Sequence, residues 1–556
     1  MLPKILTTAP TQFSEQQTRA LLAADPTTVV TAGAGAGKTR TLVARYLALL
    51  AEGLSPRQVT AVTFTNKAAR EMRNRVRQEI GAYLRRPNLP PDDSALWQAI
   101  YRELDAARIG TIHSLCAEIL RSHPAEAGLD PRFELLDEGR SAISRGQAVD
   151  DALAEAAGDP AMQSLFAGLG ERRLHLTLAD LLARRLDALA AFAGQPANLL
   201  DHWRAKLSEW QRQALDRLEA NPDWAGSLAI LRDNAARKED DRMEVQRRVA
   251  LALFDAAAGD VPERLAVLAH LDSINLVGGA QGGWPGGKFQ LEAVKAALRT
   301  LRELWRANAS LLGLALNPQD ERLAGLLPPL HTLFLAAAER YRRQKEAGHA
   351  LDFDDLEAHT LALLQTHAEV RAYWQRALRV ILVDEFQDTN RRQSDLIDLL
   401  RGPDSRLFVV GDAKQSIYRF RGADVSVYRH KQATAGQLHE LSTSYRAHAR
   451  LIDALNQLLG PVLGAPAADL PDFAAPFAPL GIFRRDPKPG LQPPFLELHL
   501  AVGSKSEGAL ERSAQAVAGR LRQMIAAGEI AAGEVAILCR ASTAFAAYEN
   551  ALEAAG

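Results

Sequence analysis

The feature that most constrains the fold of this chain is a glycine-rich loop at residues 32–39, Ala-Gly-Ala-Gly-Ala-Gly-Lys-Thr. It follows the β-branched run 27–31 and leads into residues 39–50, whose apolar periodicity is that of an amphipathic helix. The spacing matches the phosphate-binding loop G-x-x-x-x-G-K-[ST], with Ala32 in place of the first glycine. A strand, such a loop and a helix in succession predict an α/β fold of the P-loop type.

Four more β-branched runs, each ending in polar or glycine residues, are typical of strands in a buried parallel sheet. They occupy residues 59–66, 107–114, 379–385 and 406–412. Ligands of such open sheets bind beyond the carboxyl ends of the strands. We therefore expect the polar residues at the ends of all five runs to lie near one another.

Phosphate chemistry is the first function that these residues indicate. In a P-loop, backbone N–H groups hold the phosphates, Lys38 reaches the β and γ oxygens, and the Thr39 hydroxyl binds Mg²⁺. Asp384 would also hold Mg²⁺, and Glu385 would activate an attacking water. An isolated acidic pair is more often a solvated turn, but beside a P-loop it completes a nucleotide hydrolysis site. The predicted cofactors are ATP and Mg²⁺, and the predicted loop residues are Ala32, Gly33, Ala34, Gly35, Ala36, Gly37, Lys38 and Thr39.

Composition limits the class of protein. A chain of 556 residues is expected to form roughly three or four domains. The 66 Lys+Arg and 67 Asp+Glu residues nearly cancel, so a nucleic-acid site must be a local patch. The 2 cysteines are far apart in sequence, which argues against a disulfide framework. Without an apolar run of about 18 residues or a signal-peptide core, we expect a cytoplasmic protein with no membrane partner.

The stretch between His113 and Asp384 is rich in Ala, Leu and Arg and has mainly helical periodicity, which indicates a helical insertion in the sheet domain. Within it, residues 278–288 are dense in glycine but follow no strand and lack a Gly-Lys-Ser/Thr ending. They are interpreted as a flexible loop or wing, not a phosphate cradle. The carboxylates of residues 351–356 could form a second site, but a cluster at a helix start is the simpler interpretation.

The C-terminal part is expected to begin a second unit of the same kind. Residues 460–494 are rich in proline and predict an extended connection. The patterns at 495–500, 506–527 and 534–540 predict a strand, a helix and a strand.

Seven stretches, in this order, resemble the motifs of UvrD/Rep/RecB-type superfamily one DNA helicases. They are FSEQQTRAL (13–21), GAGAGKT (33–39), TFTNKAAREMRNRV (63–76), GTIHS (110–114), VDEFQDTN (383–390), GDAKQSIYRFRGAD (411–424) and STSYRA (442–447). The resemblance covers residues 13–556 and implies RecA-like P-loop domains with a large, mainly α-helical insertion. Phe420-Arg421-Gly422 in place of Trp-Arg-Gly, the sequence GDAKQ and the long insertion resemble the RecB/AddA branch. Ser444 stands where the family usually has Asn.

The resemblance implies roles around the nucleotide. Gln17 would read the adenine edge, Arg40 would lie near the base, and Tyr445 would stack on it. Gln415 would sense the γ-phosphate, and Arg446 would be an arginine finger, a group typically worth about 10³–10⁵ in rate. The expected catalytic residues are Lys38, Glu385, Gln415 and Arg446.

The resemblance also implies a track for single-stranded DNA. Such tracks combine cationic contacts with aromatic platforms. The expected DNA-binding residues are Thr63, Phe64, Asn66, Thr111, His113, Tyr418, Phe420 and Arg421. The alternatives are core packing for Phe64 and Phe420 and a structural hydrogen bond for His113.

The expected domains are a first motor domain at residues 1–120 and 346–435, a helical insertion at 121–345, and an incomplete second motor domain at 436–556. Later family motifs are not found before Gly556, so the chain is expected to be C-terminally truncated. The expected function is an ATP-dependent, 3′-to-5′ helicase or translocase in recombination or repair; the polarity comes from the resemblance alone. The expected partners are single-stranded DNA, single/double-strand junctions and a second subunit of a helicase–nuclease. The alternatives are a truncated ATP- and DNA-binding module that does not unwind DNA, and the N-terminal part of a helicase–nuclease.

Overall fold

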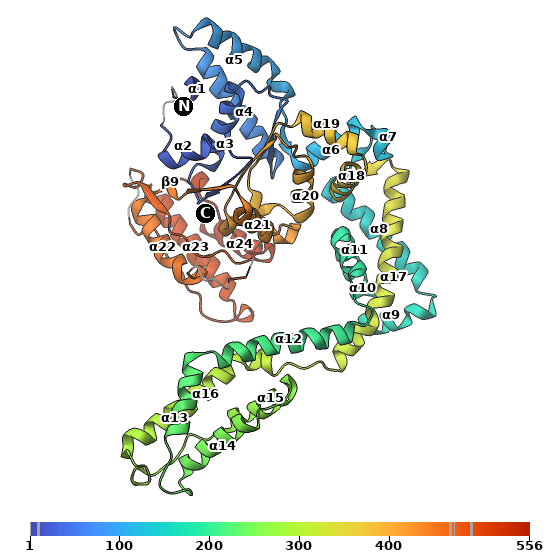
Figure 1. Cartoon of the computed structure of the whole chain (residues 1–556). Helices are drawn as coiled ribbons and strands as arrows, with labels where there is room; N and C mark the ends of the chain where they lie inside the picture. The colour runs from blue at the N-terminus through green and yellow to red at the C-terminus, as the bar shows by residue number, and fades with distance from the viewer. Residues whose placement is uncertain (1, 8–11, 466–469, 472, 490–492) are drawn as a thin grey trace. The chain divides into compact units, whose positions relative to one another are not determined.

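The computed structural model describes residues 2–7, 12–465, 470–471, 473–489 and 493–556. The chain forms two compact units, Met1–Leu136 with Gly348–Gly556, and Asp137–Ala347 (Figure 1). The second unit is helical and overlaps the stretch 121–345 that was predicted as a helical insertion, whereas residues 121–136 belong to the first unit. The finer domain limits given above remain a proposal.

The first unit is built on a six-stranded sheet with the order β3-β2-β6-β7-β1-β8, in which every neighbouring pair is parallel. The strands are β1 (Thr27–Ala32), β2 (Val59–Thr63), β3 (Ile109–Thr111), β6 (Val380–Val383), β7 (Arg406–Gly411) and β8 (Gln437–Leu441). The five predicted strands and the α/β fold class are confirmed. β8 was not predicted because it is an edge strand of mostly polar residues, without the continuous apolar run of a central parallel strand.

Both faces of this sheet are buried, as alternate strand residues show. Val30, Leu382 and Phe408 pack in one core with α3 (Lys38–Ala51) and α4 (Asn66–Leu84). Their neighbours along the strands, Val29 and Ile381 among them, pack in a second core with α6 (Ile112–Ser122), α18 (Phe353–Thr366) and α20 (Arg391–Leu399). Successive side chains of a strand point to opposite faces, so the two helical layers fix the sheet from both sides.

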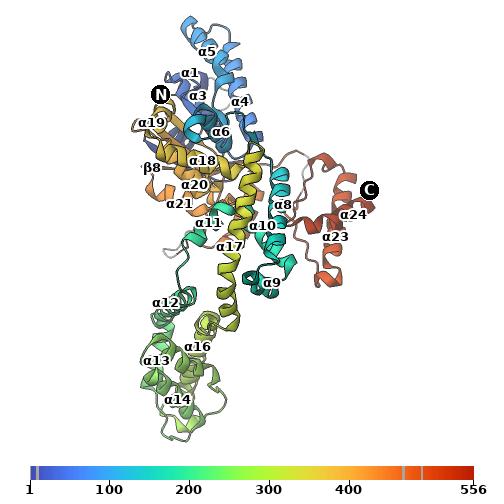
Figure 2. The ribbon, with the colours of Figure 1, turned by 90° about the vertical axis from the view of Figure 1, so that its right-hand side faces the viewer.

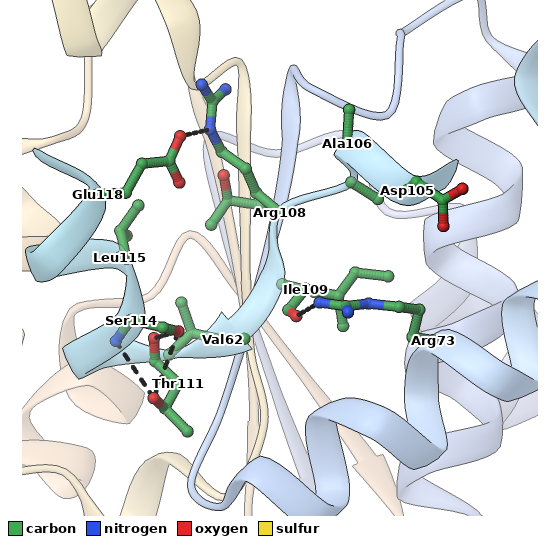
Figure 3. Close-up of a pocket in the computed structure, with 14 residues that line it drawn as sticks. Val62, Arg73, Asp105, Ala106, Arg108, Ile109, Thr111, Ser114, Leu115 and Glu118 are labelled. Carbon is green, nitrogen blue, oxygen red and sulfur yellow. Dashed lines mark hydrogen bonds and ion pairs between the residues drawn. The ribbon is translucent and has the colours of Figure 1, made fainter. Parts of the chain in front are cut away.

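The outer edge of β3 borders a cavity of about 270 Å³ between α4 and α6 (Figure 3). Here the Arg73 guanidinium donates to the carbonyl oxygen of Ile109 at 2.6 Å, and the Ser114 hydroxyl donates to that of Thr111 at 2.7 Å. These two side chains thus form hydrogen bonds with carbonyl oxygens that would otherwise accept from the N–H groups of an added strand. This protects the edge from pairing with another chain.

The helical unit has two separate cores (Figure 2). One lies among α8 (Glu138–Ala156), α10 (Glu171–Ala183) and α17 (Pro318–Ala347). The other lies among α12 (Leu199–Glu219), α13 (Pro222–Asp233), α14 (Arg242–Ala256) and α16 (Gly287–Leu312). Among the described residues of either unit, no helix combines the length and apolar character that crossing a bilayer requires.

The glycine-rich stretch at 278–286 is mainly a loop, as predicted, and it is anchored to the helical unit at Trp284. Trp284 is 2% exposed within the second core. The backbone N–H of Ala280 donates to the Asp241 carboxylate at 2.7 Å. Gly279 has φ +90°, and a Cβ there would lie 2.7 Å from Leu291. Its glycines therefore permit close packing around one buried tryptophan.

The predicted C-terminal strand–helix–strand unit is correct only for its helix. That helix is α23 (Ala509–Ala526), which packs on α24 (Phe545–Ala555). Residues 495–500 and 534–540 form no strand, and Leu500 and Leu538 are 90% and 94% exposed. An apolar run becomes a strand only beside a partner strand, and the described residues supply none here. The proline-rich stretch 460–494 contains one short strand, β10 (Gly481–Arg484), parallel to β9 (Thr443–His448); residues 466–469, 472 and 490–492 lie outside the described part.

Candidate nucleotide site and single-strand track

The P-loop connects β1 to α3 through left-handed glycines. Gly35 and Gly37 have φ +75° and +86°, a region that favours glycine, and α3 begins at Lys38 directly after Gly37. This geometry turns the first N–H groups of α3 toward the end of the sheet, where anions are stabilised. The left-handed glycines and the helix start at Lys38 agree with the predicted loop at 32–39, and its phosphate-binding role stays a prediction.

Lys38 is the centre of the polar contacts beyond the loop. Its ammonium donates to Glu385 Oε2 at 2.7 Å and to Gln415 Oε1 at 3.0 Å. Glu385 follows β6 and Gln415 follows β7, so adjacent parallel strands bring three predicted catalytic residues together. Glu385 has φ +50°, which is uncommon for a residue other than glycine and is typical of strained functional sites.

Three carboxylates, those of Asp384, Glu385 and Asp388, lie around this lysine. Burial, and then the negative charge of Glu385, raise the pKa of Asp384 to about 6 against the opposing effect of Lys38. The same causes raise the pKa of Asp388 to about 6. Within the described part of the chain no three His, Cys, Asp or Glu side chains form a ready cation cage. Mg²⁺ in phosphate sites is usually held by one or two carboxylates plus phosphate oxygens, and the residue types of Asp384 and Thr39 fit that mode.

Gln387 is a buried residue of this site that sequence reasoning missed. Its amide nitrogen donates to Glu385 Oε2 at 2.8 Å, and its Oε1 accepts from the N–H of Asp412 at 2.9 Å. Asp412 in turn accepts from the Gln415 amide nitrogen at 2.8 Å, which turns the Gln415 oxygen toward Lys38. The only sequence signal for Gln387 was its place between Glu385 and Asp388.

A segment from β9 closes over the tip of the P-loop. The N–H of Tyr445 donates to the carbonyl oxygen of Gly35 at 2.9 Å. A Cβ at Gly35 would lie 2.7 Å from the Ser444 hydroxyl and 2.8 Å from Arg446 Cβ. Arg446 therefore lies beside the loop, while the Tyr445 ring packs on Phe483 with centroids 4.6 Å apart.

Gln17 and Arg40 border the loop from the N-terminal side. The Gln17 amide is 2% exposed; its nitrogen donates to Ala36 O, and its oxygen accepts from the N–H of Ser14, both at 3.1 Å. The Arg40 guanidinium lies 4.3 Å from the centroid of Phe13, and burial lowers its pKa. Gln17 in this structure supports the P-loop backbone, and its adenine role stays a prediction.

The aromatic residues predicted for the single strand form one cluster. Phe64 stacks on Tyr418 with ring centroids 4.6 Å apart, and Tyr418 contacts Phe420 at 5.8 Å. Arg421 lies 5.4 Å from the centroid of Tyr418. Phe420 is 67% exposed, which is unlike a core residue, whereas Phe64 is half-buried.

The remaining predicted DNA residues follow β2 and β3. Thr63 pairs with Thr111 across these strands and is buried, with its hydroxyl donating to Thr65 O at 3.0 Å. Thr111 caps α6 by accepting from the N–H of Ser114 at 3.3 Å, and Asn66 is exposed at the start of α4. His113 has a structural partner, Glu357, at 3.1 Å.

Comparisons with known proteins agree with this arrangement. The family described as "UvrD/REP helicase N-terminal domain" matches residues 13–266 and 295–435. Curated proteins named as one subunit of an ATP-dependent helicase/nuclease are similar over most of the chain. The one from Desulforudis audaxviator is 29% identical over 93% of this chain and 47% of its own length, and that from Exiguobacterium sibiricum is 27% identical over 92% and 45%. The chain thus spans about half the length of these curated relatives. The P-loop (33–39), the motif VDEFQDTN (383–390) and the segment 411–424 lie at the ends of strands of one parallel sheet. Together with the match of the family model, this shows that the chain belongs to the UvrD/REP helicase family.

Proposed function

We propose that this chain is the ATP-hydrolysing motor of a DNA helicase or translocase that acts on single-stranded DNA in recombination or repair. The observation that supports it best is the contact of Lys38 with both Glu385 and Gln415, which joins the P-loop to the ends of two neighbouring strands. Family membership and the names of the relatives agree with this activity.

In the proposed reaction, Lys38 and the P-loop backbone bind the β- and γ-phosphates. Glu385 orients the attacking water, while Gln387 fixes the direction of its carboxylate. Arg446, which lies beside Gly35, stabilises charge on the transferring phosphoryl. Thr39 and Asp384 would hold Mg²⁺, which neutralises phosphate charge when bound. Gln17, Arg40 and Tyr445 would position the nucleoside.

Single-stranded DNA would contact Thr63, Phe64, Asn66, Thr111 and His113 after β2 and β3, and Tyr418, Phe420 and Arg421 after β7. Gln415 and Tyr418 belong to one short segment, so a shift at the γ-phosphate reaches the aromatic cluster directly. The 3′-to-5′ direction, action at duplex junctions and assembly with a second subunit belong to the same proposal. The last is suggested by the word "subunit" in the relatives' names.

Steady-state ATP hydrolysis with and without oligo(dT) tests the proposal, with a forked duplex as the substrate for unwinding. A rate stimulated by single strands supports a motor. Hydrolysis that ignores DNA contradicts it. DNA-stimulated hydrolysis without strand separation would identify this chain as an ATP- and DNA-binding part that does not unwind by itself.

A further inference from the structure

Helix α18 carries a buried carboxylate that the proposed reaction does not use. Glu357 is 3% exposed, yet four side chains surround its two oxygens. Oε1 lies 3.1 Å from His113 Nε2 and accepts from the Gln393 amide at 2.6 Å. Oε2 accepts from the Asn390 amide at 3.4 Å and lies 3.5 Å from Arg392 Nε.

The surroundings keep this carboxylate ionised. Burial by itself raises the pKa of Glu357, but hydrogen bonds from His113 and Gln393 and the charges of His113 and Arg392 outweigh it and hold that pKa below its usual range. An ionised carboxylate accepts hydrogen bonds and donates none. The bond to His113 therefore requires a proton on Nε2, which holds for both the neutral Nε2–H tautomer and the imidazolium.

His113 is held from one face of α18 by two residues. Phe353 and Glu357 are four positions apart, so they lie on the same side of the helix. The Phe353 ring lies 4.7 Å from the His113 ring, and Glu357 holds the ring nitrogen. Asp352 starts the helix with a capping box that includes Asp355, which explains the acidic cluster at 351–356 as a helix start.

The same carboxylate contacts Asn390, the last residue of the VDEFQDTN motif (383–390), and Gln393 in the first turn of α20. Asn390 caps α20, and Gln393 completes that cap. Glu357 thus contacts His113 on one side and the start of α20 on the other. No residue of the P-loop or of the 411–424 segment is among the four side chains around the Glu357 carboxylate. The 411–424 segment reaches the same region from its other side, where the N–H of Asp424 donates to the carbonyl oxygen of Thr389 at 3.2 Å.

We propose that Glu357 is a positioning residue that orients His113 in the single-strand track and couples it to residues 390–393, which lead from the last residue of the VDEFQDTN motif into α20. The inference rests on the proposed function and adds a second route from DNA to the hydrolysis site. Displacing the His113 ring must alter the other Glu357 contacts, because Oε1 is shared between His113 and Gln393, and the same carboxylate also bonds to Asn390. A shift of the α20 start then reaches Asp388, two residues before Asn390.

The test compares Glu357→Gln, His113→Ala and the double variant in oligo(dT)-stimulated and basal ATP hydrolysis and in oligo(dT) affinity. A matched control is Glu244→Gln in the helical unit, another buried carboxylate, paired with Arg247 at 2.6 Å. We expect Glu357→Gln to lower the ratio of stimulated to basal rate by at least about threefold. The ratio in the double variant should lie within about twofold of that in His113→Ala, because the two substitutions remove the two partners of the same contact. Glu244→Gln should keep the ratio.

Four outcomes overturn the inference: an unchanged ratio and affinity in Glu357→Gln, additive losses in the double variant, an equal loss in Glu244→Gln, or a basal rate that falls as much as the stimulated one. If Glu357→Gln does not fold, Gln393→Met removes a single donor to the same carboxylate. It should reduce the ratio in the same direction, and an unchanged ratio overturns the inference. An unsubstituted chain without DNA stimulation would instead contradict the proposed function itself.

Discussion

The Lys38 ammonium is 2.7 Å from the Glu385 carboxylate and bonds at the same time to the Gln415 amide oxygen, at 3.0 Å. One cation thus holds the proposed base and the proposed γ-phosphate sensor against the P-loop. A phosphate that binds to this lysine would compete with both side chains. Nucleotide binding is therefore expected to release Glu385 and Gln415 together.

Lys38→Ala should lower ATP hydrolysis by about 10²-fold or more, because it removes the cation that stabilises phosphate charge. The measurement is the steady-state rate at saturating ATP. Lys206→Ala, at a surface lysine of α12 paired with Glu209, is the matched control and should keep the full rate. Substantial hydrolysis in Lys38→Ala would contradict the site.

Asp384→Asn should stabilise the nucleotide-free chain at pH 8 while abolishing hydrolysis. The pKa of Asp384 is raised from 3.8 to about 6, so folding favours its protonated form. That stabilising contribution is complete below pH 4 and is lost as pH rises through 6. At pH 8 the ionised carboxylate costs on the order of 2–3 kcal/mol, which the neutral amide avoids. Denaturant unfolding should give Asp384→Asn a higher free energy of unfolding than the unsubstituted chain at pH 8 and nearly the same value at pH 4. If the two proteins are equally stable at both pH values, the prediction is wrong.

Gln387→Leu should reduce kcat for ATP by about tenfold with little change in KM, because the amide directs Glu385 and does not contact phosphate. It also leaves the buried N–H of Asp412 without a partner, which should cost about 1–3 kcal/mol of unfolding free energy. Kinetics well below the melting temperature separate the two effects. A rise in KM with kcat intact would show that Gln387 acts in binding instead.

Gln415→Ala and Phe420→Ala should have different effects. The first should uncouple hydrolysis from DNA, because Gln415 contacts Lys38. The second should weaken oligo(dT) binding by about 1–3 kcal/mol, the usual worth of a base–aromatic stack, with basal hydrolysis retained. Fluorescence anisotropy gives the binding term and phosphate release the hydrolysis term. If both variants lose oligo(dT) binding and ATP hydrolysis equally, the prediction that Gln415 acts on the nucleotide and Phe420 on single-stranded DNA is wrong.

The sequence was informative where one chemical pattern coincided with one structural element. The P-loop and the five apolar runs predicted the sheet, because central parallel strands are apolar throughout. β8 was not predicted because it is a polar edge strand. Residues 495–500 were wrongly predicted as a strand, because a strand forms only beside a neighbouring strand, and the sequence of one segment does not show whether that neighbour exists. Gln387 and Glu357 were missed for a related reason. Each acts through partners distant in sequence, such as Asp412 and His113, that only the folded sheet brings within hydrogen-bond distance.

ATP hydrolysis by this chain as oligo(dT) is added, in parallel with Lys38→Ala, tests most directly whether single-stranded DNA drives this site. We expect a basal rate that rises severalfold and saturates with oligo(dT), and no such rise in Lys38→Ala. A rate that does not respond to single-stranded DNA, or a response that survives the loss of Lys38, would contradict this expectation.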